Sequence, residues 1–328
     1  MKAVVIARQG GPEALELREV ATPEARGEQV RVRVRACGLN RADLMQSRGH
    51  YPAPPGVPQD IPGLEFAGEV EALGPDVTGP VRIGDRVFGI VGGGGMAEYV
   101  LSHERMVVPI PAGLDYEAAA AVPEVFLTAF DALDTRGKVK PGERVLIHAV
   151  GGGVGSAAVQ IAHAMGCTVL GTSRTAEKLG RVAELGLDIG IATATQDFAA
   201  VVRERTGGRG VDVVIDHLGA SALAGNIEAL APRGRLILVG LLGGSQATVN
   251  LAELLRKRIT IVGTTLRGRP IEEKIAVTRR FASQVLPWFE DGRVRPVVDR
   301  VFPFADVRAA QERLESNLGF GKVVLSLG

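Results

Sequence analysis

Hydrophobic and polar positions alternate over short distances in the first part of the chain. The segment Val30–Arg35 places apolar and charged residues in strict alternation, which is the period of a strand with one buried face. The apolar run Met1–Ala7 predicts an earlier strand. The segment Tyr51–Pro58 predicts a loop, because its prolines fix φ and remove N–H donors. Residues 1 to about 120 therefore predict a mostly β domain.

The pattern changes between residues 121 and 265, where short apolar strands alternate with longer helical stretches. Such alternation is typical of parallel βαβ units and predicts an α/β, doubly wound parallel sheet. The strands expected here are Arg144–Ala149, Cys167–Thr172, Val211–Asp216 and Arg235–Val239.

A mixed pattern returns after residue 265, with an amphipathic helix over Ile271–Phe289 and a final strand over Lys322–Leu325. We expect residues 266–328 to rejoin residues 1–120 as one domain, leaving 121–265 as the dinucleotide-binding domain. A length of 328 residues is suited to two domains.

Charge and cysteine content narrow the function classes. The 38 Lys and Arg residues nearly balance the 37 Asp and Glu residues, so no basic field points to nucleic acid or to a membrane surface. A small-molecule partner is expected instead. Two cysteines are too few for a disulfide framework, and no long apolar run predicts a membrane span, so we expect a cytoplasmic protein.

The strongest local motif is the glycine cluster Gly151–Gly155, which follows a buried strand and opens a helix over Ser156–Met165. Residues without Cβ let the backbone approach a pyrophosphate at the positive end of a helix. We therefore expect a dinucleotide, and the alternative is a purely structural glycine turn. The residues expected to contact it are Gly152, Gly153, Val154 and Gly155.

The second strand of this sheet ends without the acidic residue that accepts a ribose 2′-hydroxyl in NAD-binding sheets. Ser173, Arg174 and Lys178 stand there instead, and they suit a 2′-phosphate, which favours NADPH. An ordinary solvated helix start is the alternative. Later strand ends place further cofactor contacts at the same sheet edge, namely His217, Val239, Gly240 and Leu241.

Several ordered motifs resemble the medium-chain dehydrogenase/reductase superfamily. They are Asn40–Gln46, Gly49–Pro52, Pro62–Gly68 and Gly84–Val87. The chain is most similar to the zinc-independent, zeta-crystallin-like quinone oxidoreductase branch, and within it to the tumour-suppressor-induced type. This resemblance implies a GroES-like β domain, a six-stranded Rossmann domain, a cleft between them and a homodimer joined through the Rossmann sheets.

The resemblance also implies that no metal takes part. Zinc alcohol dehydrogenases carry Cys at the position of Asn40 and Gly-His-Glu at Gly63–Glu65, where this chain has Gly-Leu-Glu. Leucine does not coordinate zinc and an amide oxygen is a poor ligand for it. The family pattern brings Tyr51 and Asn40 to the catalytic site, with Tyr51 as hydrogen-bond donor or acid. Alternatively, Tyr51 anchors its loop and Asn40 bonds to its own backbone at a turn.

The same resemblance implies two more cofactor contacts. Thr128 is expected beside the nicotinamide, and Asn317 occupies a position where some bacterial relatives carry an arginine near the 2′-phosphate. The proline-rich loop after Tyr51 and the segment Thr264–Arg269 are expected to line the acceptor pocket.

Hydride transfer without a metal requires an acceptor that is already electrophilic. We therefore expect an NADPH-dependent oxidoreductase that reduces quinones or α,β-unsaturated carbonyls. Two alternatives stay open, an enoyl-thioester or polyketide-pathway reductase on the same fold and an NADPH-binding sensor with negligible turnover.

Overall fold

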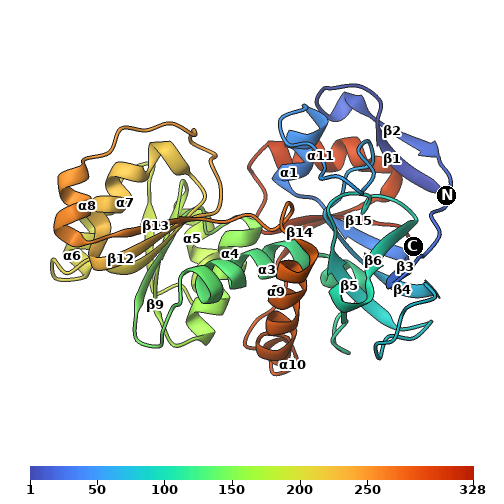
Figure 1. Ribbon diagram of the computed structural model, residues 1–328. Helices are drawn as coiled ribbons and strands as arrows, with labels where there is room; N and C mark the ends of the chain where they lie inside the picture. The colour runs from blue at the N-terminus through green and yellow to red at the C-terminus, as the bar shows by residue number, and fades with distance from the viewer. The chain divides into compact units, whose positions relative to one another are not determined.

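Two stretches far apart in sequence form one folding unit in the computed structural model, which describes residues 1–328. Unit 1 comprises Met1–Leu127 and Leu266–Gly328, and unit 2 comprises Thr128–Thr265. The blue and red ends of the chain accordingly lie in the same unit in Figure 1. The chain enters unit 2 between residues 127 and 128 and leaves it between residues 265 and 266.

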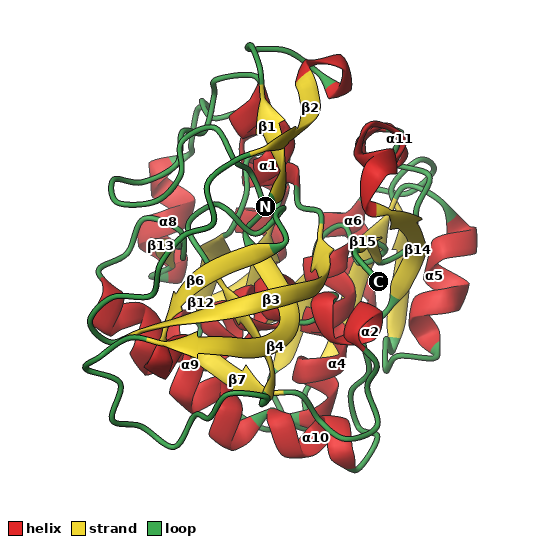
Figure 2. Ribbon diagram, turned by 90° about the vertical axis from the view of Figure 1, so that its right-hand side faces the viewer, coloured by secondary structure: helices red, strands yellow, loops and turns green.

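Unit 1 is built on an open seven-stranded sheet with β14, β15, β3, β4, β5 and β7 in order and β6 paired to β3, as Figure 2 shows for its central strands. The alternating segment forms β3, where Val30, Val32 and Val34 are buried. The strands of unit 1 are β1 Lys2–Ile6, β2 Leu15–Glu19, β3 Gln29–Gly38, β4 Glu65–Leu73, β5 Arg86–Ile90, β6 Tyr99–His103, β7 Val107–Pro109, β14 Val298–Pro303 and β15 Lys322–Ser326.

The helices of unit 1 depart from expectation at one place. The single helix expected over Ile271–Phe289 is wrong, because the helix ends at Gln284 and a second one starts at Leu286. Pro287 lacks an N–H and its ring would clash with the preceding turn, so the first helix does not continue. The helices are α1 Arg41–Ser47, α2 Tyr116–Ala120, α3 Pro123–Phe130, which crosses into unit 2, α9 Ile271–Gln284, α10 Leu286–Glu290 and α11 Val307–Glu315.

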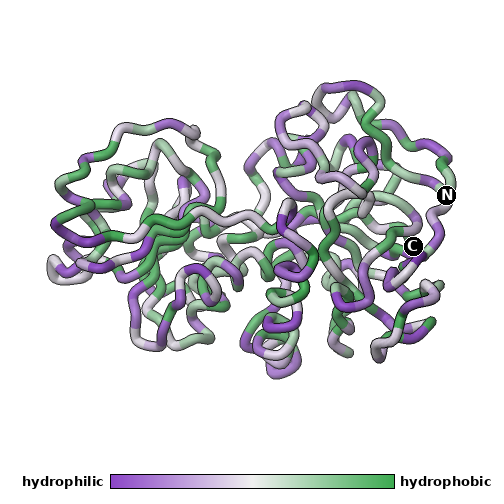
Figure 3. The backbone as a smooth tube through the Cα atoms, viewed as in Figure 1, coloured by the Kyte–Doolittle hydropathy of each residue, from purple (hydrophilic) through white to green (hydrophobic).

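Unit 2 contains the predicted parallel sheet, with six strands in the order β10, β9, β8, β11, β12, β13. This is the order of a doubly wound sheet. Successive strands are added in one direction from β8 to β10 and in the other from β11 to β13, and ligands bind at the point between β8 and β11 where the order reverses. Its strands run side by side as a hydrophobic green layer in Figure 3, as expected for a sheet covered on both faces. They are β8 Arg144–Ile147, β9 Thr168–Ser173, β10 Ile189–Ala192, β11 Val211–Asp216, β12 Leu230–Leu238 and β13 Thr260–Gly263.

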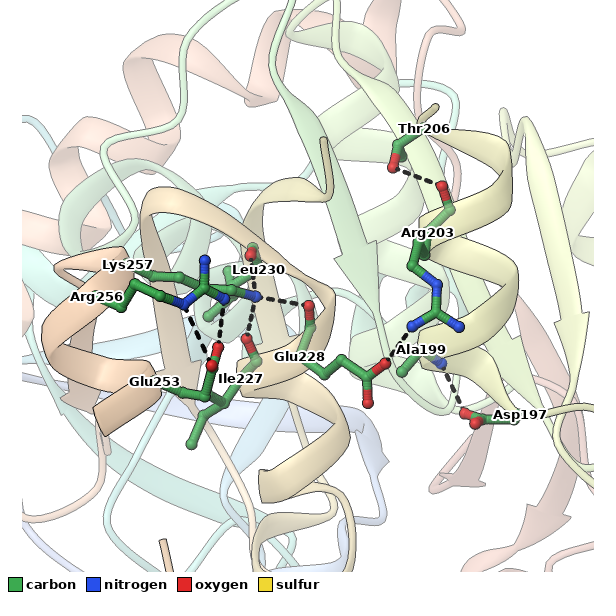
Figure 4. A network of polar contacts seen from close by, with 10 residues as sticks. All are labelled: Asp197, Ala199, Arg203, Thr206, Ile227, Glu228, Leu230, Glu253, Arg256 and Lys257. Carbon is green, nitrogen blue, oxygen red and sulfur yellow. Dashed lines mark hydrogen bonds and ion pairs between the residues drawn. The ribbon is translucent and has the colours of Figure 1, made fainter. Parts of the chain in front are cut away.

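The helices of unit 2 are α4 Gly153–Ala164, α5 Ala176–Ala183, α6 Phe198–Arg205, α7 Leu223–Ala229 and α8 Leu251–Lys257, with a π-helical segment over Asp131–Arg136. Lys257 holds the end of α7, since its ammonium donates to the carbonyls of Ile227, Glu228 and Leu230 at 2.7–2.8 Å (Figure 4). A cation at this end satisfies carbonyls that have no partner within the helix. No helix of the chain has the length and apolar character needed to cross a membrane.

Candidate active site

Asn40, one of the two expected catalytic residues, lies at the start of α1 in unit 1 and is 9% exposed. Its amide nitrogen donates to Oε1 of Glu65 at 2.8 Å, and its amide oxygen accepts from Nζ of Lys322 at 2.7 Å. Its backbone N–H donates to Asp43 at 2.7 Å. Contacts to β4 and β15 therefore fix the orientation of this amide, and its second N–H is left for a further acceptor.

Lys322 is the cation at the centre of this group. Its ammonium donates to the carbonyl of Leu39 and to Oε1 of Glu65, each at 2.6 Å, in addition to the Asn40 amide. Lys322 is 4% exposed and Glu65 is completely buried. All three N–H bonds of the ammonium thus have acceptors. Gly38 makes room for the pair, since a Cβ there would collide with the Glu65 carboxylate.

Two more carboxyl groups surround the pair. Burial raises the pKa of Asp43 to about 6, against the effect of N–H groups from Asn40 and Gly63. Burial and then the charge of Glu65 raise the pKa of Glu124 to about 8, while its backbone N–H donates to Glu65 at 2.8 Å. At neutral pH the Glu124 carboxyl is therefore mostly protonated.

Tyr51, the other expected catalytic residue, is half-buried in the proline-rich loop. Its hydroxyl makes no hydrogen bond within the chain, and the guanidinium carbon of Arg267 lies 5.0 Å from its ring centroid. Burial raises the pKa of the phenol, and the charge of Arg267 opposes that shift. The contact with Arg267 holds the aromatic ring, and the hydroxyl stays available to a ligand. This geometry accommodates both the anchoring role and the donor role.

The glycine turn in unit 2 opens α4 as predicted. Gly152 is the N-cap, and no side chain caps the helix, so the N–H groups of its first turn, which includes Gly153 and Val154, are open to an anion. A Cβ at Gly155 would collide with the carbonyl of Ala149, whereas one at Gly152 would only touch it at 3.4 Å. Gly155 therefore permits strand and helix to pack closely, and Gly152 leaves open space above the turn.

Two of the three residues expected at the 2′-phosphate stand at the end of β9, and the third packs against the glycine turn. Ser173 is buried as the last residue of that strand, and Arg174 is exposed and forms no ion pair or hydrogen bond within the chain. The stem of Lys178 packs against the glycine turn, where a Cβ at Gly151 would lie 2.8 Å from its Cδ. Two cations thus lie at the same edge of the sheet as the glycine turn.

His217 follows β11 at this edge and carries an unsatisfied nitrogen. Its Nδ1 donates to the carbonyl of His148 at 3.1 Å, so in the neutral ring Nε2 is an acceptor. Burial lowers the pKa of His217 to about 4, which keeps the ring neutral at pH 7. Nε2 is buried without a hydrogen-bond partner. A dinucleotide, which carries amide and hydroxyl donors, fits such an orphan acceptor.

The remaining expected contacts are spread over both units. Val239 and Gly240 donate to the carbonyl of Asp216, which pins the loop after β12 to the end of β11, and Leu241 is 55% exposed there. Thr128 is the first residue of unit 2. Asn317 lies in unit 1, and its amide accepts from Arg41 and donates to the carbonyl of Glu315. Its assignment to the cofactor stays a prediction.

Comparison with known proteins identifies the family. Two family models match, "Alcohol dehydrogenase GroES-like domain" over residues 26–112 and "Zinc-binding dehydrogenase" over residues 153–283. The quinone oxidoreductases of Lama guanicoe and human are 36% and 34% identical over 330 residues, covering 100% of this chain and 98% of each relative. The chain belongs to the quinone oxidoreductase family of the medium-chain dehydrogenases/reductases. It is an enzyme of the quinone oxidoreductase type.

Solved structures confirm the expected domain types, a GroES-like domain and a Rossmann domain. A structure titled NAD-dependent alcohol dehydrogenase matches with a TM-score of 0.89 and 34% identity over the whole of both chains. Escherichia coli quinone oxidoreductase complexed with NADPH matches at 0.89 and 28%, covering 99% of this chain and 100% of that one. CurK enoyl reductase matches at 0.87 and 27%, covering 99% and 98%.

Sequence reasoning did not single out Lys322 or Glu124 as functional residues of this quinone oxidoreductase, and it named Arg267 only as part of the segment Thr264–Arg269 expected to line the acceptor pocket. The available signal was a charged residue directly before an apolar strand, Lys322-Val323-Val324-Leu325. Buried charges are rare and need partners, so such a position merits a search for the counter-charge. The partner Glu65 is 257 residues away, which no local pattern reveals.

Proposed function

We propose that this chain is a zinc-independent reductase that uses NADPH to reduce quinones or α,β-unsaturated carbonyls. The observation that carries zinc independence is the ammonium of Lys322 between Asn40 and Glu65. In the zinc alcohol dehydrogenases that the chain resembles, the positions of Asn40 and Leu64 carry the ligands Cys and His, and Glu65 directly follows the second. Here an amide and Leu64 replace two ligands, and a lysine already neutralises the carboxylate. A divalent cation next to that ammonium would be repelled, so the residues do not fit zinc.

The cofactor proposal rests on the edge of the unit 2 sheet. The uncapped start of α4 suits a pyrophosphate, and Arg174 and Lys178 suit a 2′-phosphate. The unsatisfied Nε2 of His217 supplies an acceptor for a further donor of the dinucleotide. NADPH, when bound, supplies the hydride. The E. coli relative that was solved with NADPH supports this choice.

The acceptor proposal follows from the lack of a Lewis acid. A quinone or enone is electrophilic without a metal, and the chain then has to stabilise the negative charge that forms on its oxygen. The proposed donor to that oxygen is the hydroxyl of Tyr51, which has no hydrogen-bond partner within the chain, and the second N–H of the Asn40 amide is the other candidate donor.

The test follows absorbance at 340 nm with purified protein, NADPH or NADH, and a panel of acceptors with and without chelator. The panel contains a benzoquinone, an ortho-quinone, an enone, an alkenal and an enoyl thioester. We expect turnover of quinone or enone that prefers NADPH and survives chelation. Loss of turnover on chelation, restored by zinc, would overturn the metal-free proposal.

An enoyl-thioester reductase is the second candidate, and the likeness to CurK enoyl reductase favours it. A thioester preferred over every quinone and enone in the panel would select it. A sensor would bind NADPH, and so gain thermal stability, without consuming it in the presence of any acceptor.

We also propose that two copies pair through unit 2. β13 is the edge strand of the six-stranded sheet, and Ile261 on it is 38% exposed. Leu251 and Leu255 on α8 are 67% and 78% exposed. An uncovered edge strand beside apolar side chains favours pairing with a second copy about a two-fold axis. Light scattering should give a dimer for the native chain and a monomer for Ile261→Lys, and a monomeric native chain would refute the pairing.

The compartment we propose is the cytoplasm. Cys37 and Cys167 are both unpaired and buried, and burial raises the pKa of the Cys167 thiol to about 11. Thiols of this kind suit a reducing compartment. Fractionation of cells that express the tagged chain would test the proposal, and recovery outside the cytoplasmic fraction would contradict it.

A further inference from the structure

Arg267 holds the loop that carries Tyr51. The residue is 7% exposed and lies just after the chain re-enters unit 1. Its Nε donates to the carbonyl of Gly92 at 2.7 Å, Nη1 to the carbonyl of Tyr51 at 2.9 Å and Nη2 to Oε1 of Gln46 at 2.5 Å. Gln46 also donates to the carbonyl of Gln59 at 3.0 Å. The guanidinium thereby links the Tyr51 end of the proline-rich loop to Gln46 on α1, and Gln46 itself holds the Gln59 end.

The charge of this guanidinium is not neutralised by contact. All three of its acceptors are neutral oxygens, and Arg267 forms no ion pair. A buried charge is costly unless it is paired. A buried guanidinium without a carboxylate partner therefore points to a function for its charge. The carboxyls that act on it from further away are Asp43 and Glu124, and Glu124 is mostly protonated at neutral pH.

The unpaired charge lies against one specific group, the aromatic ring of Tyr51. The distance of 5.0 Å from Cζ to the ring centroid is within the range of a cation–π contact. A cation at this place favours the ionised phenol over the neutral one. The charge of Arg267 accordingly lowers the pKa of Tyr51, whereas burial raises it. Arg267 therefore makes the hydroxyl a stronger hydrogen-bond donor and a better acid than burial alone would leave it, while the pKa of the phenol stays above its usual value.

We propose that Arg267 is a positioning residue that orients Tyr51 and polarises its hydroxyl toward the oxygen of the bound acceptor. The inference rests on the proposed reductase activity. In that reaction the acceptor carbon gains a hydride, with its two electrons, from NADPH. The displaced π electrons move to the carbonyl oxygen, which accepts a hydrogen bond or proton from Tyr51, and water returns any proton that Tyr51 gives up. The nicotinamide is left oxidised, and one solvent proton is consumed in each turnover.

The kinetic test compares Arg267→Met, Tyr51→Phe and the double variant on the best quinone or enone. We expect each single variant to lower kcat roughly 100-fold with little change in NADPH affinity, as for the loss of one transition-state donor. The double variant should lose no more than the worse single variant, because Arg267 acts through Tyr51. Multiplied losses, or native kcat in Arg267→Met, would overturn the proposal.

The matched control is Arg86→Met. Arg86 stacks over Tyr116 at 4.6 Å and donates to the carbonyl of Leu114, so it makes the same kind of contact elsewhere in unit 1. Its removal should leave kcat unchanged. Arg267→Lys keeps the charge without the planar fork and should recover part of the lost rate. If thermal melting shows that Arg267→Met does not fold, Arg267→Lys takes its place in the kinetic comparison.

A spectroscopic test separates this inference from the proposed function. The chain has three tyrosines, so labelling with 3-fluorotyrosine should give three fluorine resonances, and Tyr51→Phe assigns one of them. Arg267→Met should shift that resonance and raise the pKa it reports, while Arg86→Met should shift only the Tyr116 resonance. An unmoved Tyr51 resonance would refute the positioning role even if the native enzyme is active. Lack of turnover in the native chain would instead refute the proposed function.

Discussion

The ammonium of Lys322 lies 2.6 Å from Oε1 of Glu65, and at 4% and 0% exposure the two side chains form a buried ion pair between β15 and β4. The ammonium also donates a hydrogen bond to the Asn40 amide, and its charge lowers the pKa of Asp43 and of Glu124 against the effect of burial. One cation therefore pairs with the Glu65 carboxylate and opposes the effect of burial on the pKa of Asp43 and Glu124. The orientation of the Asn40 amide depends on the same cation.

Replacement of Lys322 by methionine should destabilise the fold. The change keeps most of the volume but leaves Glu65 buried without its cation, and removal of one partner of a buried pair costs about 3–5 kcal/mol of unfolding free energy. Urea denaturation at pH 7 measures it. Asp291→Asn breaks the equally short but half-exposed pair with Arg293 and should cost at most about 1 kcal/mol. Equal losses in the two variants would contradict the central role of Lys322.

Glu124 should make the fold less stable as the pH rises. Its pKa is about 8 in the folded protein and 4.5 for a fully solvated glutamate, so the folded state binds the extra proton between these values. Stability is thus fully present below pH 4.5 and declines as the pH rises through 8. Glu124→Gln should remove this slope, with a relative gain of about 1–3 kcal/mol between pH 5 and pH 8.5, because partial solvent contact reduces the full effect.

The control for this pH dependence is Glu272→Gln. Glu272 is exposed, and its ion pair with Arg105 lowers its pKa, so its contribution is lost only at more acidic pH. Its effect on stability should be the same at pH 5 and pH 8.5. A parallel pH profile for native protein and Glu124→Gln in chemical denaturation would show that Glu124 titrates normally.

The sequence was informative where a pattern is local. β11 has the predicted bounds Val211–Asp216, because a continuous apolar run encodes a strand that is buried on both faces. The glycine turn and the exposed Arg174 follow in the same way from neighbours in sequence. The break between α9 and α10 was also encoded locally, by Pro287, but the hydrophobic period continues across it and concealed it.

The other half of the candidate site could not be predicted locally. Arg267 meets Gln46 across 221 residues of sequence, and Lys322 meets Glu65 across 257. Side-chain contacts of this kind arise only when the second chain segment returns to unit 1. Composition and periodicity carry no information about such pairings, because most lysines and arginines of this chain lie at its surface.

The two glycines of the turn should separate cofactor binding from folding. Gly152→Ala should bind NADPH more weakly, by roughly tenfold or more, at native stability, since its Cβ would only touch Ala149 but would enter the space open to a pyrophosphate. Gly155→Ala should instead destabilise the fold, because its Cβ collides with the carbonyl of Ala149. Calorimetric titration and thermal melting measure the two effects. If Gly152→Ala binds NADPH with native affinity, the pyrophosphate does not bind at this turn.

Arg174 should decide the preference between NADPH and NADH. It is exposed at the end of β9 without an ion pair, so its charge is available to a 2′-phosphate, and a carboxylate there would repel that group. Arg174→Glu should lower the ratio of kcat/KM for NADPH to that for NADH by roughly 10- to 100-fold. Arg205→Glu makes the same charge reversal on α6 and should leave the ratio unchanged. If Arg174→Glu also leaves it unchanged, the 2′-phosphate is not recognised at this strand end.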